Sequence, residues 1–348
     1  RETWGDDGML HRQIDYDKNR NRTRVIDSLG YVTTYEWSDL GVVTRETDHH
    51  GNSWRFDYNE SLQRTRVEDP EGNIWAYEYD DLGNIAKEEN PEGAVREYVW
   101  NQDNRLAVYI DPLGNEWSYE YDNENRETKI TNPEGGITRE KRTSNGDLAA
   151  MIEPDGSLSR YKYDSFANLT LASLPGGLQI ERRYDARGAL IFERDNAGES
   201  KKVKYDVMSR AKFIWSRDRG MEKLARDAEG RIIRIKDAKQ KITGYEYGLF
   251  ENVKCISYPE VEILGGIKLS NKKTYQYDTE NRVVSVELPG KEFVKYDFDG
   301  QDRPMRVSYP DGRVQSFVRN KRGFIRQLFE NEKLVYTQES DSTGRVLH

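Results

Sequence analysis

The sequence has 348 residues, a formal net charge of −8 and a charged fraction of 33%, yet its 22 Tyr, 10 Phe and 7 Trp distinguish it from disordered chains of similar polarity. Lys and Arg are mixed with Asp and Glu throughout and no apolar run approaches about 18 residues, so neither a nucleic-acid-binding protein nor a membrane span is expected. The single cysteine, Cys255, excludes an intrachain disulfide and is expected to pack as a small strand residue.

A 21-residue spacing runs along the chain. It starts at Tyr16, continues to Tyr247, and resumes at Tyr277 after one step of 30 residues. We call these places grid positions. Four of the sixteen are Arg142, Arg226, Arg319 and Ser340, and the other twelve are aromatic: Tyr16, Trp37, Tyr58, Tyr79, Trp100, Tyr121, Tyr163, Tyr184, Tyr205, Tyr247, Tyr277 and Phe298.

Two turn signals recur in each repeat. The first lies four residues after the grid position, where Gly, Asn or Asp often stands, as in Gly83 and Asn104; these residue types tolerate positive φ. The second is a glycine seven residues before the grid position, often preceded by Asp-Pro, which is typical of a type I turn. It occurs nine times running from Gly30 to Gly198 and includes Gly72, Gly93, Gly114, Gly135 and Gly156.

Between these turns the sequence alternates with period two. Trp54, Phe56 and Tyr58 would share one strand face, and the segments 75–79 and 117–121 repeat this pattern. A return strand follows each tight turn, with an aliphatic residue such as Val67 nine residues after the grid position. We therefore predict an all-β fold of tandem hairpins with almost no helix.

The whole chain, 1–348, is predicted to be one repeat array with a register break and insertion at about 248–276. The insertion is expected to be an elongated hairpin or a contact with cargo or with a neighbouring turn. Sixteen units of two strands give roughly 32 strands, and so long an antiparallel sheet should curl into a spiral wall rather than lie flat. The chain starts and ends within repeats, so we expect an excerpt of a larger protein.

The segments Tyr77–Asn84 and Tyr161–Asn168, together with the Asp-Pro-x-Gly linkers, resemble the RHS repeat family, also called YD repeats. The resemblance covers essentially the whole chain and is weakest at about 217–272. It implies a β-sheet shell of the kind found in bacterial Rhs toxins, insecticidal toxin complexes, wall-associated proteins and teneurins. For a bacterial Rhs protein it further implies a secreted or delivered product. The implied partners are the rest of the shell, an enclosed C-terminal toxin domain and PAAR and VgrG secretion components.

No catalytic, cofactor or metal site is predicted. Carboxylates such as Asp80, Asp122 and Asp164 recur beside the grid and are expected to cap turns, whereas a catalytic group would be unique. His49 and His50 are adjacent in a turn, and neighbouring residues that point apart are poor co-ligands for a metal.

The leading hypothesis is thus a non-enzymatic shell segment that encloses a toxin. Two alternatives stay open. One is an adhesion module that binds glycans through exposed aromatic rings, and the other is an enzyme embedded in the array.

Overall fold

The computed structural model describes residues 2–3, 9–122, 124, 126–248, 250–263, 267–269, 271–341 and 345–346. Thirty-two strands form one antiparallel sheet, and two more form a separate small sheet. The only helical segments among the described residues are two three-residue turns, Lys18–Arg20 (η2) and Pro175–Gly177 (η3). The predicted all-β hairpin array is confirmed.

The strands of the first half are β1 Glu2–Thr3, β2 Arg12–Asp17, β3 Arg22–Ile26, β4 Val32–Trp37, β5 Val43–Thr47, β6 Ser53–Tyr58, β7 Arg64–Glu68, β8 Ile74–Tyr79, β9 Ile85–Glu89, β10 Val95–Trp100, β11 Leu106–Ile110, β12 Glu116–Tyr121, β13 Glu127–Thr131, β14 Ile137–Arg142, β15 Leu148–Ile152, β16 Leu158–Tyr163 and β17 Leu169–Ser173. Those of the second half are β18 Gln179–Tyr184, β19 Leu190–Asp195, β20 Gly198–Tyr205, β21 Ala211–Ser216, β22 Gly220–Arg226, β23 Ile232–Lys236, β24 Ile242–Tyr247, β25 Val253–Ser257, β26 Val261–Ile263, β27 Ile267–Leu269, β28 Lys272–Tyr277, β29 Val283–Leu288, β30 Glu292–Phe298, β31 Pro304–Ser308, β32 Val314–Arg319, β33 Ile325–Glu330 and β34 Lys333–Thr337.

The chain divides into two compact units. Unit 1 consists of the two ends, Arg1–Val95 and Tyr245–His348, and unit 2 is Arg96–Gly244. Within each unit, strands pair with the next strand along the chain, as in Tyr77↔Glu88 between β8 and β9. From β4 to β32, every strand that leads into a tight turn ends at a grid position.

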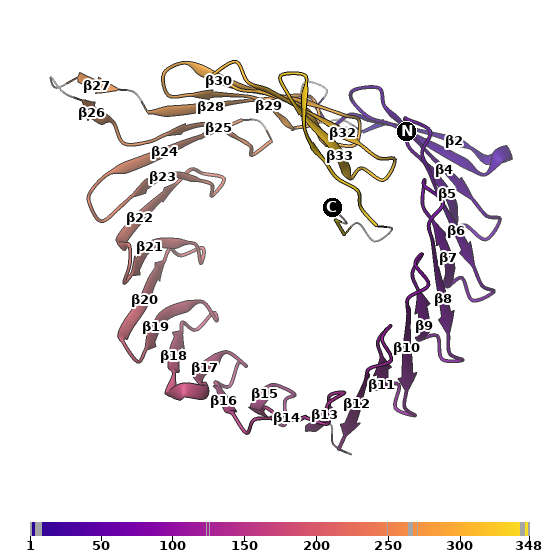
Figure 1. Cartoon of the computed structure of the whole chain (residues 1–348). Helices are drawn as coiled ribbons and strands as arrows, with labels where there is room; N and C mark the ends of the chain where they lie inside the picture. The colour runs from indigo at the N-terminus through magenta and orange to yellow at the C-terminus, as the bar shows by residue number, and fades with distance from the viewer. Residues whose placement is uncertain are drawn as a thin grey trace. The chain divides into compact units, whose positions relative to one another are not determined.

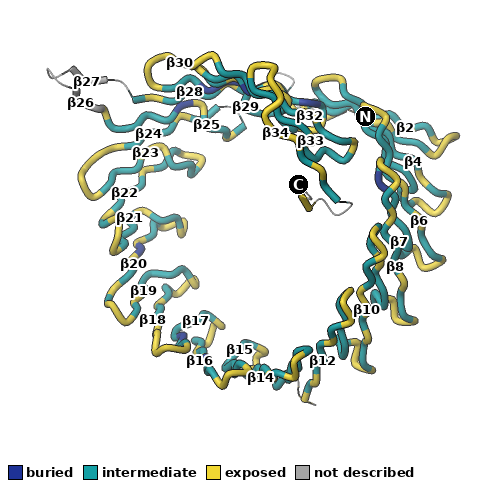
Figure 2. Tube along the Cα trace, viewed as in Figure 1, coloured by how far each residue is buried: buried dark blue, intermediate teal, exposed yellow. Residues whose placement is uncertain are grey.

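The sheet has no second layer over most of its surface. Figure 2 shows the chain as mostly half-buried, and no large side chain among the described residues is fully buried. Only five apolar residues of the described chain are buried, each in a different repeat: Ala172, Val203, Cys255, Val286 and Val307. Cys255 is a free thiol within the sheet, as expected. Stability must therefore come from contacts between neighbouring repeats.

Both turns of the repeat have the same backbone geometry. In each, the fourth residue of a type I turn donates its N–H to the carbonyl of the first and has positive φ, as Gly72 does to Asp69 and Gly83 to Asp80. At four described tight turns, the left-handed position holds a residue that is not Gly, Asn or Asp: Leu62, Ala167, Ser209 and Glu251, with φ values of 60°, 61°, 60° and 58°. These four places carry no turn signal in the sequence, and the fold imposes the conformation.

The carboxylate after the grid position caps the tight turn, as expected. The Oδ1 atom of Asp80 accepts the N–H groups of Leu82 and Asn84, and its Oδ2 atom accepts the Asn84 side-chain amide at 2.9 Å. These hydrogen bonds, the amide of Asn84 foremost, hold the pKa of Asp80 below its ordinary value.

The nine additional residues of the insertion lie outside the main sheet. Strand β25 pairs directly with β28, with Cys255 opposite Thr274, and β26 and β27 form the separate two-stranded sheet between them (Figure 1). The insertion is therefore a hairpin of its own, and the main sheet continues past it without loss of register. A contact between the insertion and cargo stays a prediction.

Replacing Leu62 with Gly should raise the free energy of unfolding by about 1 kcal/mol, because a side chain in the left-handed region carries a steric cost. Leu62 is exposed, so little packing is lost. The shift of the urea midpoint would measure the effect. The reverse change, Gly146→Ala, places a Cβ at φ +90° with nothing within 4 Å, and should destabilise by a similar amount. If both variants shift the midpoint in the same direction, backbone strain is not the cause.

Candidate functional site

The grid residues join each repeat to the one before it. The hydroxyl of Tyr163 donates a hydrogen bond of 3.0 Å to the carbonyl of Leu148, fifteen residues earlier. The same fifteen-residue bond is made by Tyr58, Tyr79, Tyr121, Tyr184 and Tyr205. Tyr277 bonds to Val253, twenty-four residues back, so the bond is kept across the insertion.

At two of the four grid positions that lack an aromatic residue, arginine takes over this role. Arg319 donates from Nη2 to the carbonyl of Pro304 at 3.0 Å, and Arg226 donates to that of Ala211 at 3.4 Å, again fifteen residues back. Each also donates from Nη1 to the glycine carbonyl of its own tight turn. These two positions depart from the aromatic pattern of the grid, but they make an equivalent contact with different chemistry.

The remaining predicted grid residues also lie at or near strand ends, and several of them make other contacts. Trp37 donates from Nε1 to Thr23, Phe298 lies under the Arg282 guanidinium at 4.8 Å, and Tyr16 is 57% exposed near the chain end. Trp100 and Tyr247 are half-buried at their strand ends. Gly72, Gly93, Gly114, Gly135 and Gly156 all have positive φ in their turns.

A second set of contacts joins the two ends of the chain within unit 1. Tight turns of the C-terminal repeats contact Asp-x-x-Gly or Asn-x-x-Gly turns of the N-terminal repeats, and the pairs advance by about 21 residues on both sides. We call this set the seam. One pair from each step is Ser28–Glu280, Asp48–Gln301, Asp69–Arg322 and Glu92–Arg345, the first separated by 252 residues in sequence and the others by 253.

The Glu280 carboxylate is held by three groups at one end of the seam. It accepts two hydrogen bonds from the Arg12 guanidinium, at 2.8 and 2.6 Å, and one of 2.9 Å from the Ser28 N–H. The Ser28 hydroxyl also donates to it. Burial by itself raises the pKa of Glu280, but the bonds from Arg12 and Ser28 together outweigh burial and lower it.

The most deeply buried pair of the seam joins Asp69 and Arg322. Their side chains are 0% and 9% exposed, and Arg322 Nε lies 2.9 Å from Asp69 Oδ2. The guanidinium also lies 5.4 Å from the ring of Trp75 and 4.9 Å from that of Phe324. Desolvated ion pairs of this kind cost free energy to form but fix a unique register, because a shifted partner leaves a buried charge alone.

His49 lies in the seam rather than in a solvated turn. A side chain on residue 300 would overlap its ring, so Gly300 is needed there, and Tyr31 and His50 lie beside it with ring centroids at 4.5 and 3.8 Å. Burial lowers the pKa of His49 and the charge of His50 lowers it further, against weaker opposing effects of Asp48, Asp299 and Asp27. The rings of His49 and His50 thus do lie together, contrary to the expectation that they point apart, but they pack against each other.

The described part of the chain holds no cluster of three His, Cys, Asp or Glu side chains arranged to bind a metal. Across the same residues, no helix has the length and apolar character to cross a bilayer. The seam residues Glu280, Gln301 and Arg322 were missed in the sequence. Each stands third after a grid position, where turn residues are ordinarily solvated, so residue type alone carried no signal.

The sequence model of the teneurin YD-shell matches residues 7–174, the first part of this same repeat ladder. This match, which covers just under half of the chain, supports an RHS/YD-repeat family. No curated protein sequence shows significant similarity to this RHS/YD array.

Solved structures share the fold of the RHS/YD array at low sequence identity. The complex TcdB2–TccC3 without its hypervariable C-terminal region matches 99% of the chain with a TM-score of 0.80 and 13% identity. TcdB2–TccC3 itself matches with a TM-score of 0.79, and the Photorhabdus luminescens Tc holotoxin pore with 0.58, both at 13% identity over 99% of the chain. The array spans only 22–23% of the length of those chains. This fold is a structural scaffold.

Replacing Tyr163 with Phe removes the hydroxyl that reaches Leu148, and should lower the free energy of unfolding by about 0.5–1.5 kcal/mol. The urea midpoint of the full chain measures this change. Tyr161, two residues earlier on the same strand face, has no hydroxyl hydrogen bond among the described residues. The Tyr161→Phe variant should therefore be nearly neutral, and an equal loss in both would refute the role of the fifteen-residue bond.

Replacing Arg322 with Ala leaves the Asp69 carboxylate buried without its partner, which costs about 3–5 kcal/mol. Amide hydrogen exchange should speed up at both faces of the seam, over 69–72 and 320–323, with little change in unit 2. Lys321→Ala removes an exposed cation from the same turn and serves as the control. Exchange that speeds up equally in both variants would contradict the pairing.

Acidification should loosen the seam. Because the pKa of His49 is lowered in the folded state, the unfolded form binds a proton first, and the stability is present above about pH 6.5 and lost as the pH falls below it. The protection of the backbone amides at 299–303 against hydrogen exchange, relative to their intrinsic exchange rates, should decrease from about pH 7.5 to 5.5. The His49→Gln variant should abolish the pH dependence and His11→Gln should keep it.

Proposed function

We propose that this chain is a shell segment of a secreted bacterial Rhs toxin and that the shell encloses a C-terminal toxin domain. The observation that carries the proposal is the seam. Hairpins twelve repeats apart touch edge to edge through contacts that repeat with the period of the array, at pairs such as Asp48–Gln301 and Asp69–Arg322. Rows of hairpins that meet in this way make a barrier, which an isolated binding module does not require.

The function is steric. A sheet whose rows are held together excludes proteases and keeps an enclosed domain from its targets until release, without any reactive group in the array. The partners of the segment are then the rest of its own shell and the enclosed toxin domain, with PAAR and VgrG components as the delivery apparatus. The shared fold of TcdB2–TccC3, a complex with a hypervariable C-terminal region, supports this assignment.

Limited proteolysis of the full-length gene product tests the proposal. The C-terminal domain should be cleaved far more slowly within the full protein than as an isolated domain. Arg322→Glu, which places two carboxylates in the buried part of the seam, should speed its cleavage, and the matched variant Lys321→Glu should not. If the C-terminal domain is cut at the rate of the isolated domain while the array stays intact, the enclosure is disproved.

An adhesion module that binds carbohydrate is the second candidate. Tyr16 and Trp37 have 57% and 36% of their surface exposed, and aromatic rings offer platforms for sugars. The match to the teneurin YD-shell is compatible with this role. Saturable binding on a glycan array that is lost in a Tyr16→Ala, Trp37→Ala variant would favour it over enclosure.

A further inference from the structure

A groove in unit 2 departs from the repeat rule on the sheet face opposite the grid residues. In four repeats, an acidic residue one before the grid position lies across from a basic residue eight after it. The resulting ion pairs are Glu36–Arg45, Asp57–Arg66, Glu78–Lys87 and Glu120–Lys129, with N–O distances of 3.8, 3.4, 3.4 and 2.6 Å. In these four repeats, this face is therefore neutral at that place.

The repeat of Tyr205 has a cation and an aromatic ring at the same two places. Lys204 lies across from Phe213, and two residues further on, Lys202 lies across from Trp215. Lys223 and Met221 follow across the next strand, opposite Phe213 and Trp215. Lysine Nζ atoms lie 5.8 Å from each of the two ring centroids, from Lys202 to Trp215 and from Lys223 to Phe213.

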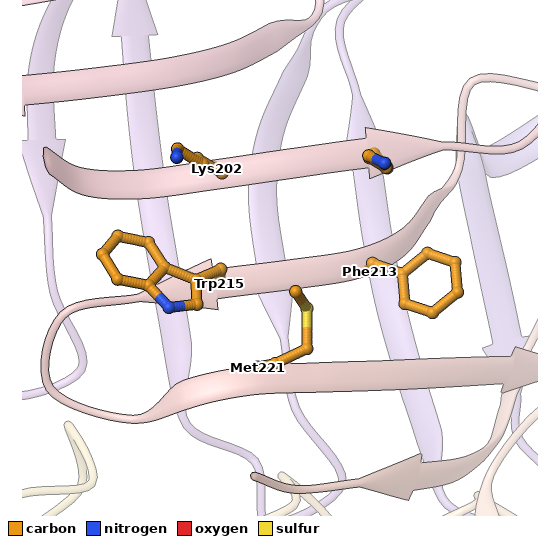
Figure 3. Close-up of a pocket in the computed structure, with 5 residues that line it drawn as sticks. Lys202, Phe213, Trp215 and Met221 are labelled. Atoms are coloured by element: carbon orange, nitrogen blue, oxygen red, sulfur yellow. The ribbon is translucent and has the colours of Figure 1, made fainter.

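An open groove of about 410 Å³ runs across strands β20, β21 and β22 and is lined by Lys202, Lys204, Phe213, Trp215 and Met221 (Figure 3). Lys223 lies beside this lining, across from Phe213. Figure 3 shows Phe213, Trp215 and Met221 along its floor, with Lys202 beside Trp215. Phe213 and Trp215 are half-buried, whereas the lysines and Met221 are exposed. Methionine adapts its shape to irregular apolar groups, so the floor suits a large apolar side chain.

Most of the positive charge around the groove has no ion-pair partner among the described residues. Lys202 pairs with Glu199 at 2.5 Å, but Lys204, Lys212 and Lys223 have no ion pair in the part of the chain that the structure describes. Residues 201–241 hold fourteen Lys and Arg against six Asp and Glu, a net charge of +8 in a chain whose total is −8. The even mixing of charges expected from the sequence fails here.

We propose that this groove binds a segment of a separate polypeptide in which Asp or Glu residues flank one or two large apolar side chains. The apolar side chain lies between Phe213 and Trp215 against Met221, and the carboxylates reach Lys204 and Lys223. A long polyanion fits less well, because the remainder of the chain carries a charge of −16 and repels it. The proposal does not rest on the enclosing function, and either can fail without the other.

The test uses the full chain and a fluorescein-labelled twelve-residue peptide that alternates Asp or Glu with Leu or Phe, followed by fluorescence anisotropy. We expect saturable binding that weakens as salt is added. A peptide with Lys in place of the acids, and one with Ser in place of Leu and Phe, should bind at least tenfold more weakly. A single-stranded oligonucleotide serves as the polyanion arm.

The variant Lys204→Glu, Lys223→Glu should weaken peptide binding at least tenfold. The control variant Lys239→Glu, Lys241→Glu makes the same charge change in the same basic segment, outside the groove, and should leave binding within about threefold; both variants should keep the midpoint of unfolding. Met221→Ser tests the apolar floor and should also weaken binding. The proposal would be overturned if both charge variants lost binding equally or if the Ser peptide bound as tightly as the Leu and Phe peptide. Tighter binding of the oligonucleotide than of the peptide would also overturn it.

Discussion

Each repeat of this array can be covered only by its neighbours, because the sheet is a single layer with no second element packed on it over most of its length. The contact on which this arrangement depends is the hydrogen bond from the grid side chain to the carbonyl fifteen residues earlier, as in Tyr163 to Leu148. It joins the end of one strand to the start of the return strand in the preceding repeat. A polar group at the tip of a large ring makes this possible, since the ring covers apolar surface while the hydroxyl satisfies a backbone acceptor.

The substitution of arginine for tyrosine at Arg226 and Arg319 shows what this position requires. Both side chains are long, and both place a donor at the same carbonyl, although one is neutral and the other charged. The insertion shows the same requirement. Nine extra residues form a separate hairpin, and the Tyr277 hydroxyl still donates a hydrogen bond to the Val253 carbonyl. In these repeats, the position thus requires a donor at a fixed place in space rather than one residue type.

The seam applies the same 21-residue period between rows of hairpins rather than along the ladder. Its contacts are polar and partly buried, and they vary from one step to the next: a bidentate Arg12–Glu280 pair, a histidine against Gly300, and the buried Asp69–Arg322 pair. Different chemistry at each step fixes the register, because a shift by one repeat would bury charges without partners. The groove of unit 2 is the converse case, where cross-strand ion pairs are absent and lysines are left for an outside ligand.

The sequence by itself determined the strands, the two turns and the number of units, because period-two alternation and turn residues act over a few neighbouring positions and recur with every repeat. It also indicated the capping role of residues such as Asp80. It did not distinguish Asp69, which is buried against Arg322, from Asp111, which sits in a turn of the same sequence type. It also gave no sign that Leu62 would adopt a left-handed backbone or that His49 would pack on Gly300. Only the tertiary structure decided these points, because they depend on which distant repeat comes to lie beside each turn, and no local pattern encodes that neighbour.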